Sequence, residues 1–335
     1  MNPAAVLARA LRDPASVLAL DSAGWTALLA VARAEQLIGT LAHRVQGLAI
    51  PSAATRVLED ARASVEQGRV AALWEAEMAR RALAGTNIPV VLLKGTAYAA
   101  AGFAAATGRS IGDLDILVPR ARIDEAEAAL LAAGWEWVKP DPYDDAYYRR
   151  WMHELPPLIH RERDRMIDVH HTILPLTARI TPDAEGLLAD SVALENGLRI
   201  LAPADMICHA AAHLLADGDL AGGMRNLWDI HCLIGEFGIE GLEARAVRHG
   251  LLSAVHRAAR QANDLYGTSI PERWRVWDSA DPLYRRRLLA RDGWGRPTRR
   301  FTRLAFYIRS HWLRMPPHLL ARHLWTKWRK GHVPA

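Results

Sequence analysis

Three aspartates in this sequence are placed where they could bind metal ions together. Asp113 and Asp115 form the motif DLD at the mouth of an apolar run, and Asp168 lies inside a second apolar run, MIDVHH. Residues two apart in an extended chain point to the same side, so the first two carboxylates are expected to be neighbours. Such a pair either faces water in a turn or holds a cation, because burying unpaired charges is costly. In isolation, the pair favours the solvated turn.

A strand–glycine–helix junction precedes the aspartates. The apolar run 88–93 predicts a buried strand, and the Ala-rich segment 95–106 predicts a helix capped by Thr96 or its neighbours. The N–H groups of Gly95 and Thr96 at such a junction form an anion site suited to phosphate. Three acids beside this turn reverse the preference for a solvated turn. Together, three carboxylates can hold one or two Mg²⁺ ions for a phosphoryl displacement.

The same stretches carry a resemblance to known proteins. The segment LLKGTAYAAAGFAAATGRSIGDLDILV, followed by MIDVHH, resembles the polymerase-β-like nucleotidyltransferase superfamily. More narrowly, the LKG motif, an Arg before DxD and an acid before His resemble a bacterial family of uncharacterised nucleotidyltransferases. The resemblance covers about residues 85–235 and leaves both ends of the chain without a counterpart.

This resemblance implies a role for each residue of the motifs. Gly95 and Thr96 would hold the β- and γ-phosphates of an NTP, with Thr96 in place of the usual Gly or Ser. Asp113 and Asp115 would bind the metals, and Asp168 would share the catalytic metal and help deprotonate the attacking hydroxyl. The implied reaction transfers a nucleoside monophosphate from an NTP, with ATP the expected co-substrate, to a hydroxyl acceptor. Pyrophosphate is released, and the acceptor is a small molecule, a peptide, a protein or an RNA end.

Four residues near the motifs are further candidates. Lys94 and Arg109 flank the acids in sequence and either contact the triphosphate or pair with the aspartates. His170 points to the same side of its strand as Asp168, and His153 lies in the preceding loop. Both histidines are substrate-side candidates, although a structural role fits His170 equally well.

Two pairs on later helices have competing interpretations. Arg225 and Asp229 lie four apart on one helical face, which predicts a local salt bridge or a helix that closes over the nucleotide. The salt bridge is the favoured interpretation. His209 and His213 have the spacing of zinc ligands, but the chain has no CxxC motif, so packing histidines are the preferred interpretation.

The elements that must position these residues divide the chain into four parts. We predict a helical region at 1–85, an α/β (α+β) nucleotidyltransferase core with a small mixed sheet at 86–180, a helical domain at 181–284 and a basic, aromatic-rich tail at 285–335. Within the core we expect strands near 88–93, 113–119, 135–138, 155–160 and 166–173, a helix at 122–134 and a loop at 139–151.

The tail differs from the rest of the chain in charge. It carries 14 Lys and Arg and one acid, for a net charge of +13, whereas the other 284 residues carry 28 Lys and Arg and 36 acids, for −8. Such a tail suits nucleic acid or an anionic surface as partner. Docking of the tail on the acidic body is the favoured interpretation. In a further alternative, the tail is the functional end of the protein and binds nucleic acid.

Composition excludes several other classes. The 335-residue chain is half apolar, contains two cysteines and has no run of eighteen apolar residues. We therefore expect a cytoplasmic globular protein without a signal peptide, a disulfide framework or a transmembrane segment. A non-catalytic binding module that keeps the nucleotidyltransferase fold remains the alternative to the enzyme.

Overall fold

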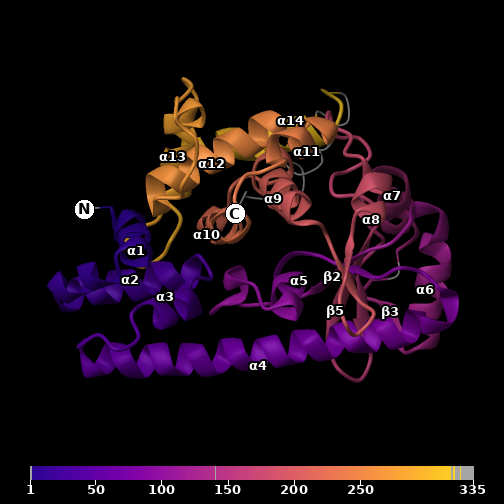
Figure 1. Ribbon diagram of the computed structural model, residues 1–335, viewed down its shortest axis with the longest axis horizontal. Coiled ribbons are helices and arrows are strands. Elements are labelled where there is room, and N and C mark those ends of the chain that lie inside the picture. The colour runs from indigo at the N-terminus through magenta and orange to yellow at the C-terminus, as the bar shows by residue number, and fades with distance from the viewer. Residues whose placement is uncertain (1, 140, 318–319, 321–324, 326–335) are drawn as a thin grey trace.

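A seven-stranded mixed sheet positions the aspartates, and it lies at one end of an otherwise helical molecule (Figure 1). The computed structural model describes residues 2–139, 141–317, 320 and 325. The strand order is β3-β4-β5-β2-β1-β7-β6, which confirms the predicted α/β class. The strands are β1 Val91–Leu92, β2 Leu114–Leu117, β3 Trp135–Trp137, β4 Leu158–His160, β5 Met166–His170, β6 Val192–Ala193 and β7 Arg199–Ile200.

Two parallel pairs interrupt the otherwise antiparallel sheet. Strand β2 runs parallel to β5 and antiparallel to β1, and β1 runs parallel to β7. All four residues of β2 are buried, as expected for a strand covered on both faces. Strands β6 and β7 lie beyond residue 180, where the sequence predicts a helical domain, and they extend the same sheet at its edge.

The N-terminal region is helical, as its apolar spacing predicts. Its elements are α1 Pro3–Arg12, the 3-10 helix η1 Pro14–Ala19, α2 Ser22–Ala34, α3 Ile38–Arg44, α4 Ser52–Leu83 and η2 Ala84–Thr86. The long helix α4 begins directly after Pro51, which is its N-cap residue. Helix α4 runs along the long axis of the molecule and packs against α5, α6 and β2 (Figure 1).

Helices between the strands cover the sheet. They are α5 Lys94–Ala101, η3 Ala104–Ala106, η4 Arg120–Arg122, α6 Ile123–Ala132 and α7 Pro142–Trp151. The prediction that Thr96 caps α5 is wrong, because α5 begins at Lys94 and has no side-chain cap. The predicted loop at 139–151 is also wrong, since most of it is α7. Pro142 suits the first turn of a helix, and Arg149 anchors the helix through ion pairs with Asp145 and Glu127.

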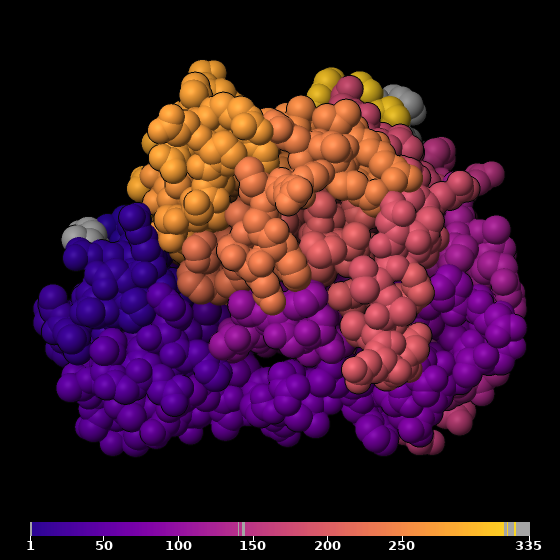
Figure 2. All heavy atoms as spheres, viewed as in Figure 1, coloured from indigo at the N-terminus to yellow at the C-terminus, as the bar shows by residue number. Residues whose placement is uncertain are grey.

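The C-terminal half stacks helices above the sheet and α5 (Figures 1 and 2). They are α8 Ala184–Ala189, α9 Pro203–Ala211, the π-helix η5 Ala212–Asp217, α10 Gly223–Phe237, α11 Leu242–Arg248, α12 Leu252–Tyr266, η6 Glu272–Trp274, α13 Asp281–Leu288 and α14 Arg300–Arg314. A short break separates α11 from α12. The break falls at Gly250, whose φ of +68° ends a helix readily.

The first part of the basic tail docks on the body. Helix α14 packs against η5, and Arg309 donates a hydrogen bond to the carbonyl of Leu215 at 2.7 Å. Thr177 in turn donates to the carbonyl of Arg314 at 2.6 Å. Apart from Leu320 and Trp325, the predicted tail beyond residue 317 lies outside the described residues.

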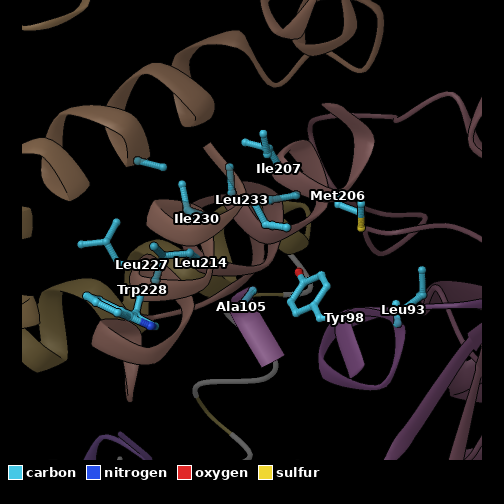
Figure 3. Close-up of a cluster of buried hydrophobic side chains, with 14 of the residues drawn as sticks. Leu93, Tyr98, Ala105, Met206, Ile207, Leu214, Leu227, Trp228, Ile230 and Leu233 are labelled. Carbon is cyan, nitrogen blue, oxygen red and sulfur yellow. The ribbon is translucent and has the colours of Figure 1, made fainter. Parts of the chain in front are cut away.

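One contiguous hydrophobic cluster joins the N-terminal helices, the sheet and the C-terminal helices. Figure 3 shows its centre, where Tyr98 of α5 lies below side chains of α9 and α10, among them Met206, Ile207 and Leu233. This packing fixes α5, and with it the residues at its N-terminus. In the described part of the chain, none of the helices combines the length and the apolar character needed to cross a bilayer.

Candidate active site

The strand register places two of the predicted aspartates side by side. Strands β2 and β5 are parallel, and Asp115 is the Cα partner of Asp168. Side chains directly opposite in neighbouring strands point to the same face. His170 lies two residues beyond Asp168 on that face, and the three residues offer ligand atoms within 4.8 Å of one another.

Asp115 is buried but well paired. Its Oδ1 accepts a hydrogen bond from Nζ of Lys94 at 2.6 Å and lies 3.1 Å from Nε2 of His170. Burial alone would raise the pKa of Asp115, but Lys94 and His170 outweigh it and hold the pKa well below its usual range. Lys94 has a φ of +50°, an uncommon conformation for a lysine. Such backbone strain collects at functional sites.

Asp168 has no such partner. Its Oδ1 is buried and makes no hydrogen bond. Burial raises the pKa of Asp168 to about 7, and the carboxylates of Glu154 and Asp115 add to the shift. Among the described residues no basic side chain forms a direct ion pair with Asp168, and the more distant charges of Lys94 and His170 do not outweigh its burial.

Asp113 lies just outside the strand. The chain becomes extended only at Leu114, so Asp113 is exposed, whereas Asp115 is buried. The spacing of the two aspartates predicts that both lie on one face of a strand. This prediction is wrong, because only Asp115 belongs to β2. Asp113 is nevertheless close enough to raise the pKa of Asp168. It stands at the solvent side of the carboxylate pair.

Residues at the start of α5 face a second cation. Gly95 and Thr96 follow Lys94 in the first turn of the helix, and both are buried. The guanidinium of Arg109 lies directly on Gly95, so that a Cβ there would come within 2.0 Å of Nη1. Only glycine leaves room for this guanidinium at the helix N-terminus.

Arg109 is held in place from α10. Its Nε donates to Oδ2 of Asp229 at 3.1 Å, and Arg225 donates to Oδ1 of the same carboxylate. Arg225 also donates to Oγ1 of Thr40 at 2.7 Å. The predicted salt bridge between Arg225 and Asp229 is thus present. It is buried and belongs to a network that reaches the predicted phosphate site.

Histidines surround the carboxylates on the side away from Arg109. His153 lies beside His170, with ring centroids 5.2 Å apart, and burial lowers its pKa well below the usual value. His209 of α9 and His213 of η5 are close enough to Lys94 and His170 to feel their charges. Among the described residues, no cysteine belongs to a group of side chains that could hold a metal ion.

The sequence prediction missed two residues that the fold brings to the site. Glu154 contacts His170, and burial raises the pKa of the Glu154 carboxyl group. Thr40 of α3 accepts from Arg225. Its position directly after the candidate His153 is the only feature of the sequence that could have identified Glu154. Thr40 has no such feature, because its role depends on packing between distant helices.

The residues present fit a divalent cation. The unpaired Oδ1 of Asp168, the second carboxylate oxygen of Asp115 and the exposed carboxylate of Asp113 are hard oxygen donors, which Mg²⁺ prefers. A cation would also supply the positive partner that Asp168 lacks. Lys94 is unable to fill this role, since it is bound to Asp115.

Comparison with known proteins gives one match. A family model described as "Uncharacterised nucleotidyltransferase" matches residues 21–267, about three quarters of the chain. The match includes the helices that carry Thr40 and Arg225 as well as the sheet. No curated protein and no solved structure matches the chain.

Proposed function

The chain belongs to the family of uncharacterised nucleotidyltransferases, and from this premise we propose that it is a Mg²⁺-dependent enzyme. It transfers a nucleoside monophosphate from an NTP, with ATP the expected co-substrate, to a hydroxyl acceptor. The observation that carries the proposal is the register pair of Asp115 and Asp168, in which the Asp168 carboxylate is buried without a partner.

In this proposal Asp113, Asp115 and Asp168 hold one or two Mg²⁺ ions. Bound Mg²⁺ offsets the negative charge of the triphosphate and of the leaving pyrophosphate. Lys94 and His170 fix Asp115 from behind through its Oδ1, so that the other carboxylate oxygen faces the metal site. His170 is therefore a positioning residue.

The N-terminus of α5 is the proposed binding site for the β- and γ-phosphates. Backbone N–H groups at Gly95 and Thr96 suit phosphate oxygens, because the first N–H groups of a helix have no partner within it. The Arg109 guanidinium against Gly95 adds a positive charge at the same place. Asp229 and Arg225 act through Arg109 by holding it there.

The proposed reaction is an in-line displacement at the α-phosphorus. The acceptor oxygen forms a bond to this phosphorus, and the bond to the bridging oxygen of pyrophosphate breaks. We assign the hydroxyl proton to Asp168, whose carboxylate lies opposite Asp115 in the proposed metal site. His153, beside the carboxylates, is proposed to face the acceptor.

The non-catalytic alternative has less support. A binding module would not need the Asp168 carboxylate, which is costly to bury in charged form. Retention of Asp113 and Asp115 beside it favours catalysis.

A nucleic-acid-binding tail is the second candidate. Several of its arginines are committed within the fold, as shown by the ion pairs of Arg285 with Asp264 and of Arg291 with Glu35. What favours contact with a partner is a row of exposed apolar side chains along α14: Phe301, Leu304, Ile308 and Trp312. This candidate predicts nucleic-acid binding that weakens steeply with salt. Removal of 285–335 without loss of such binding would refute it.

The direct test of the enzyme proposal is nucleotide binding. Each of the four NTPs is titrated into the protein by calorimetry, with Mg²⁺ and with EDTA, and pyrophosphate release is measured in parallel. We expect Mg²⁺-dependent binding of at least one NTP, and loss of pyrophosphate release in Asp113→Asn, whose exposed position leaves folding intact. Failure of all four NTPs to bind in Mg²⁺ would count against the proposal.

A further inference from the structure

A second cluster of ligand-type side chains lies behind the carboxylate pair. His153 and Glu154 belong to an extended segment that runs antiparallel to β5, with Glu154 bridged to His170. The backbone N–H of His171 donates to the carbonyl of His153 at 2.9 Å. The backbone therefore holds His153, Glu154 and His170 together, independently of any bound molecule.

The ligand atoms of the three side chains are spaced as they would be around a metal ion. Oε2 of Glu154 lies 3.3 Å from Nδ1 of His170 and 3.7 Å from Nε2 of His153. The three residues offer ligand atoms within 4.8 Å of one another. Nitrogen and oxygen ligands about 2.0–2.1 Å from a tetrahedral Zn²⁺ are separated by roughly 3.4 Å. The cluster needs little adjustment to reach this geometry.

The hydrogen bonding of His170 leaves its Nδ1 without a partner. His170 is 3% exposed, its Nε2 faces Oδ1 of Asp115 at 3.1 Å, and its buried Nδ1 makes no hydrogen bond. Donation of the Nε2 proton to Asp115 places a lone pair on Nδ1, which then faces the Glu154 carboxylate. In this tautomer the Nδ1 lone pair and the Glu154 carboxylate repel each other, and either a proton on Nδ1 or a bound metal ion relieves the repulsion.

The same arrangement is typical of metal-binding histidines. A histidine that binds a metal through one ring nitrogen usually donates the other N–H to a carboxylate, which fixes its orientation. Asp115 stands in this relation to His170. Two imidazoles and one carboxylate are a ligand set that Zn²⁺ and other first-row divalent metals accept.

We propose that His153, Glu154 and His170 bind a transition-metal ion, with Zn²⁺ the best match, at a site separate from the oxygen-ligand site of Asp113 and Asp168. The protein supplies three ligands, which leaves a fourth position for water or a substrate atom. The ion would also fix His170 and, through it, Asp115. This site does not depend on the proposed nucleotidyl transfer.

The experiment uses the full chain, stripped of metal with a chelator and dialysed. Zn²⁺ stoichiometry is measured by mass spectrometry of the metal, and Co²⁺ is added as a spectroscopic probe. The wild type is compared with Glu154→Gln, which keeps the side-chain shape, and with His153→Asn. Glu162→Gln and His43→Asn are the matched controls, because neither residue belongs to the cluster.

We expect one Zn²⁺ per chain and the intense visible absorption of tetrahedral Co²⁺ in the wild type and both controls. Affinity should fall at least tenfold in Glu154→Gln and in His153→Asn. Asp168→Asn should keep the Zn²⁺ while losing Mg²⁺-dependent nucleotide binding, which separates this test from that of the enzyme. A wild type that retains no Zn²⁺, or a Glu154→Gln protein that binds it as tightly as the wild type, would overturn the proposal.

Discussion

Asp115 on β2 and Asp168 on β5 are direct neighbours across parallel strands, but only Asp115 has a cation beside it. Lys94 and His170 hold the Asp115 carboxylate, whereas Asp168 keeps a buried oxygen without a partner. The asymmetry follows from the position of Lys94 at the end of β1, next to β2. The asymmetry gives the two acids different proposed roles. Asp115 is a fixed metal ligand, and Asp168 is a ligand that also accepts a proton.

The unpaired Asp168 should reduce the stability of the metal-free protein. Its folded pKa of about 7 lies above the ordinary 3.8, so the contribution of Asp168 to stability is greatest at low pH and is lost as pH rises through 7. We expect Asp168→Asn to raise the unfolding free energy at pH 8 by about 1–3 kcal/mol in EDTA. Urea unfolding at pH 8 and pH 5 measures this, with the exposed Asp124→Asn as control. A stability gain that is equal at both pH values would contradict the assignment.

Removing Lys94 should expose the cost of burying Asp115. Lys94→Met keeps much of the side-chain length but leaves Asp115 without its ammonium partner, so we expect a loss of about 2–4 kcal/mol in unfolding free energy. Nucleotidyl transfer should be lost at the same time. Thermal unfolding and pyrophosphate release measure the two effects, and Arg161→Met, at an exposed position, should change neither.

A methyl group at Gly95 should displace Arg109. The added Cβ of Gly95→Ala would meet Nη1 at 2.0 Å, so the guanidinium must move away from the proposed phosphate site. We expect NTP affinity to fall at least tenfold while the fold is kept. Gly85→Ala is the matched control, because nothing lies within 4 Å of a Cβ there. If calorimetry gives both variants the same NTP affinity, Arg109 does not contribute to nucleotide binding.

The carboxylate of Asp229 forms ion pairs with two arginines, so its loss should affect both. In Asp229→Asn, both Arg109 and Arg225 lose their buried counter-charge. We expect a loss of about 3 kcal/mol in unfolding free energy and weaker NTP binding. Chemical denaturation and calorimetry measure these changes. An Asp229→Asn protein as stable as the wild type would show that the network contributes little.

The sequence predicted the elements that carry the acids because buried strands have local signals. The apolar runs around Asp115 and Asp168 stand out against an Ala- and Arg-rich background. Helix α7 was not predicted because its segment, PYDDAYYRRW, is polar and aromatic and shows no regular apolar spacing. That Asp113 is exposed and Asp115 buried could not be predicted either, because the spacing of the two residues does not show where the strand begins.

Contacts between distant segments account for the rest. Glu154 meets His170 only because the chain before β4 pairs with β5, and Thr40 meets Arg225 only because α3 packs beside α10. Neither partner can be identified from neighbouring residues. Arg225 and Asp229, in contrast, were predicted as a pair, and only the link of Asp229 to Arg109 was not foreseen.

The proposed nucleotidyl transfer can be tested directly by following a label from the NTP to an acceptor. The wild type and Asp168→Asn are incubated with Mg²⁺, a cell extract and each NTP labelled at the α- or the γ-phosphate. We expect the wild type to transfer the α-label from at least one NTP to a macromolecule or small molecule, while the γ-label leaves in pyrophosphate. EDTA or Asp168→Asn should abolish this transfer. Transfer of the γ-label, or α-label transfer that Asp168→Asn leaves unchanged, would contradict it.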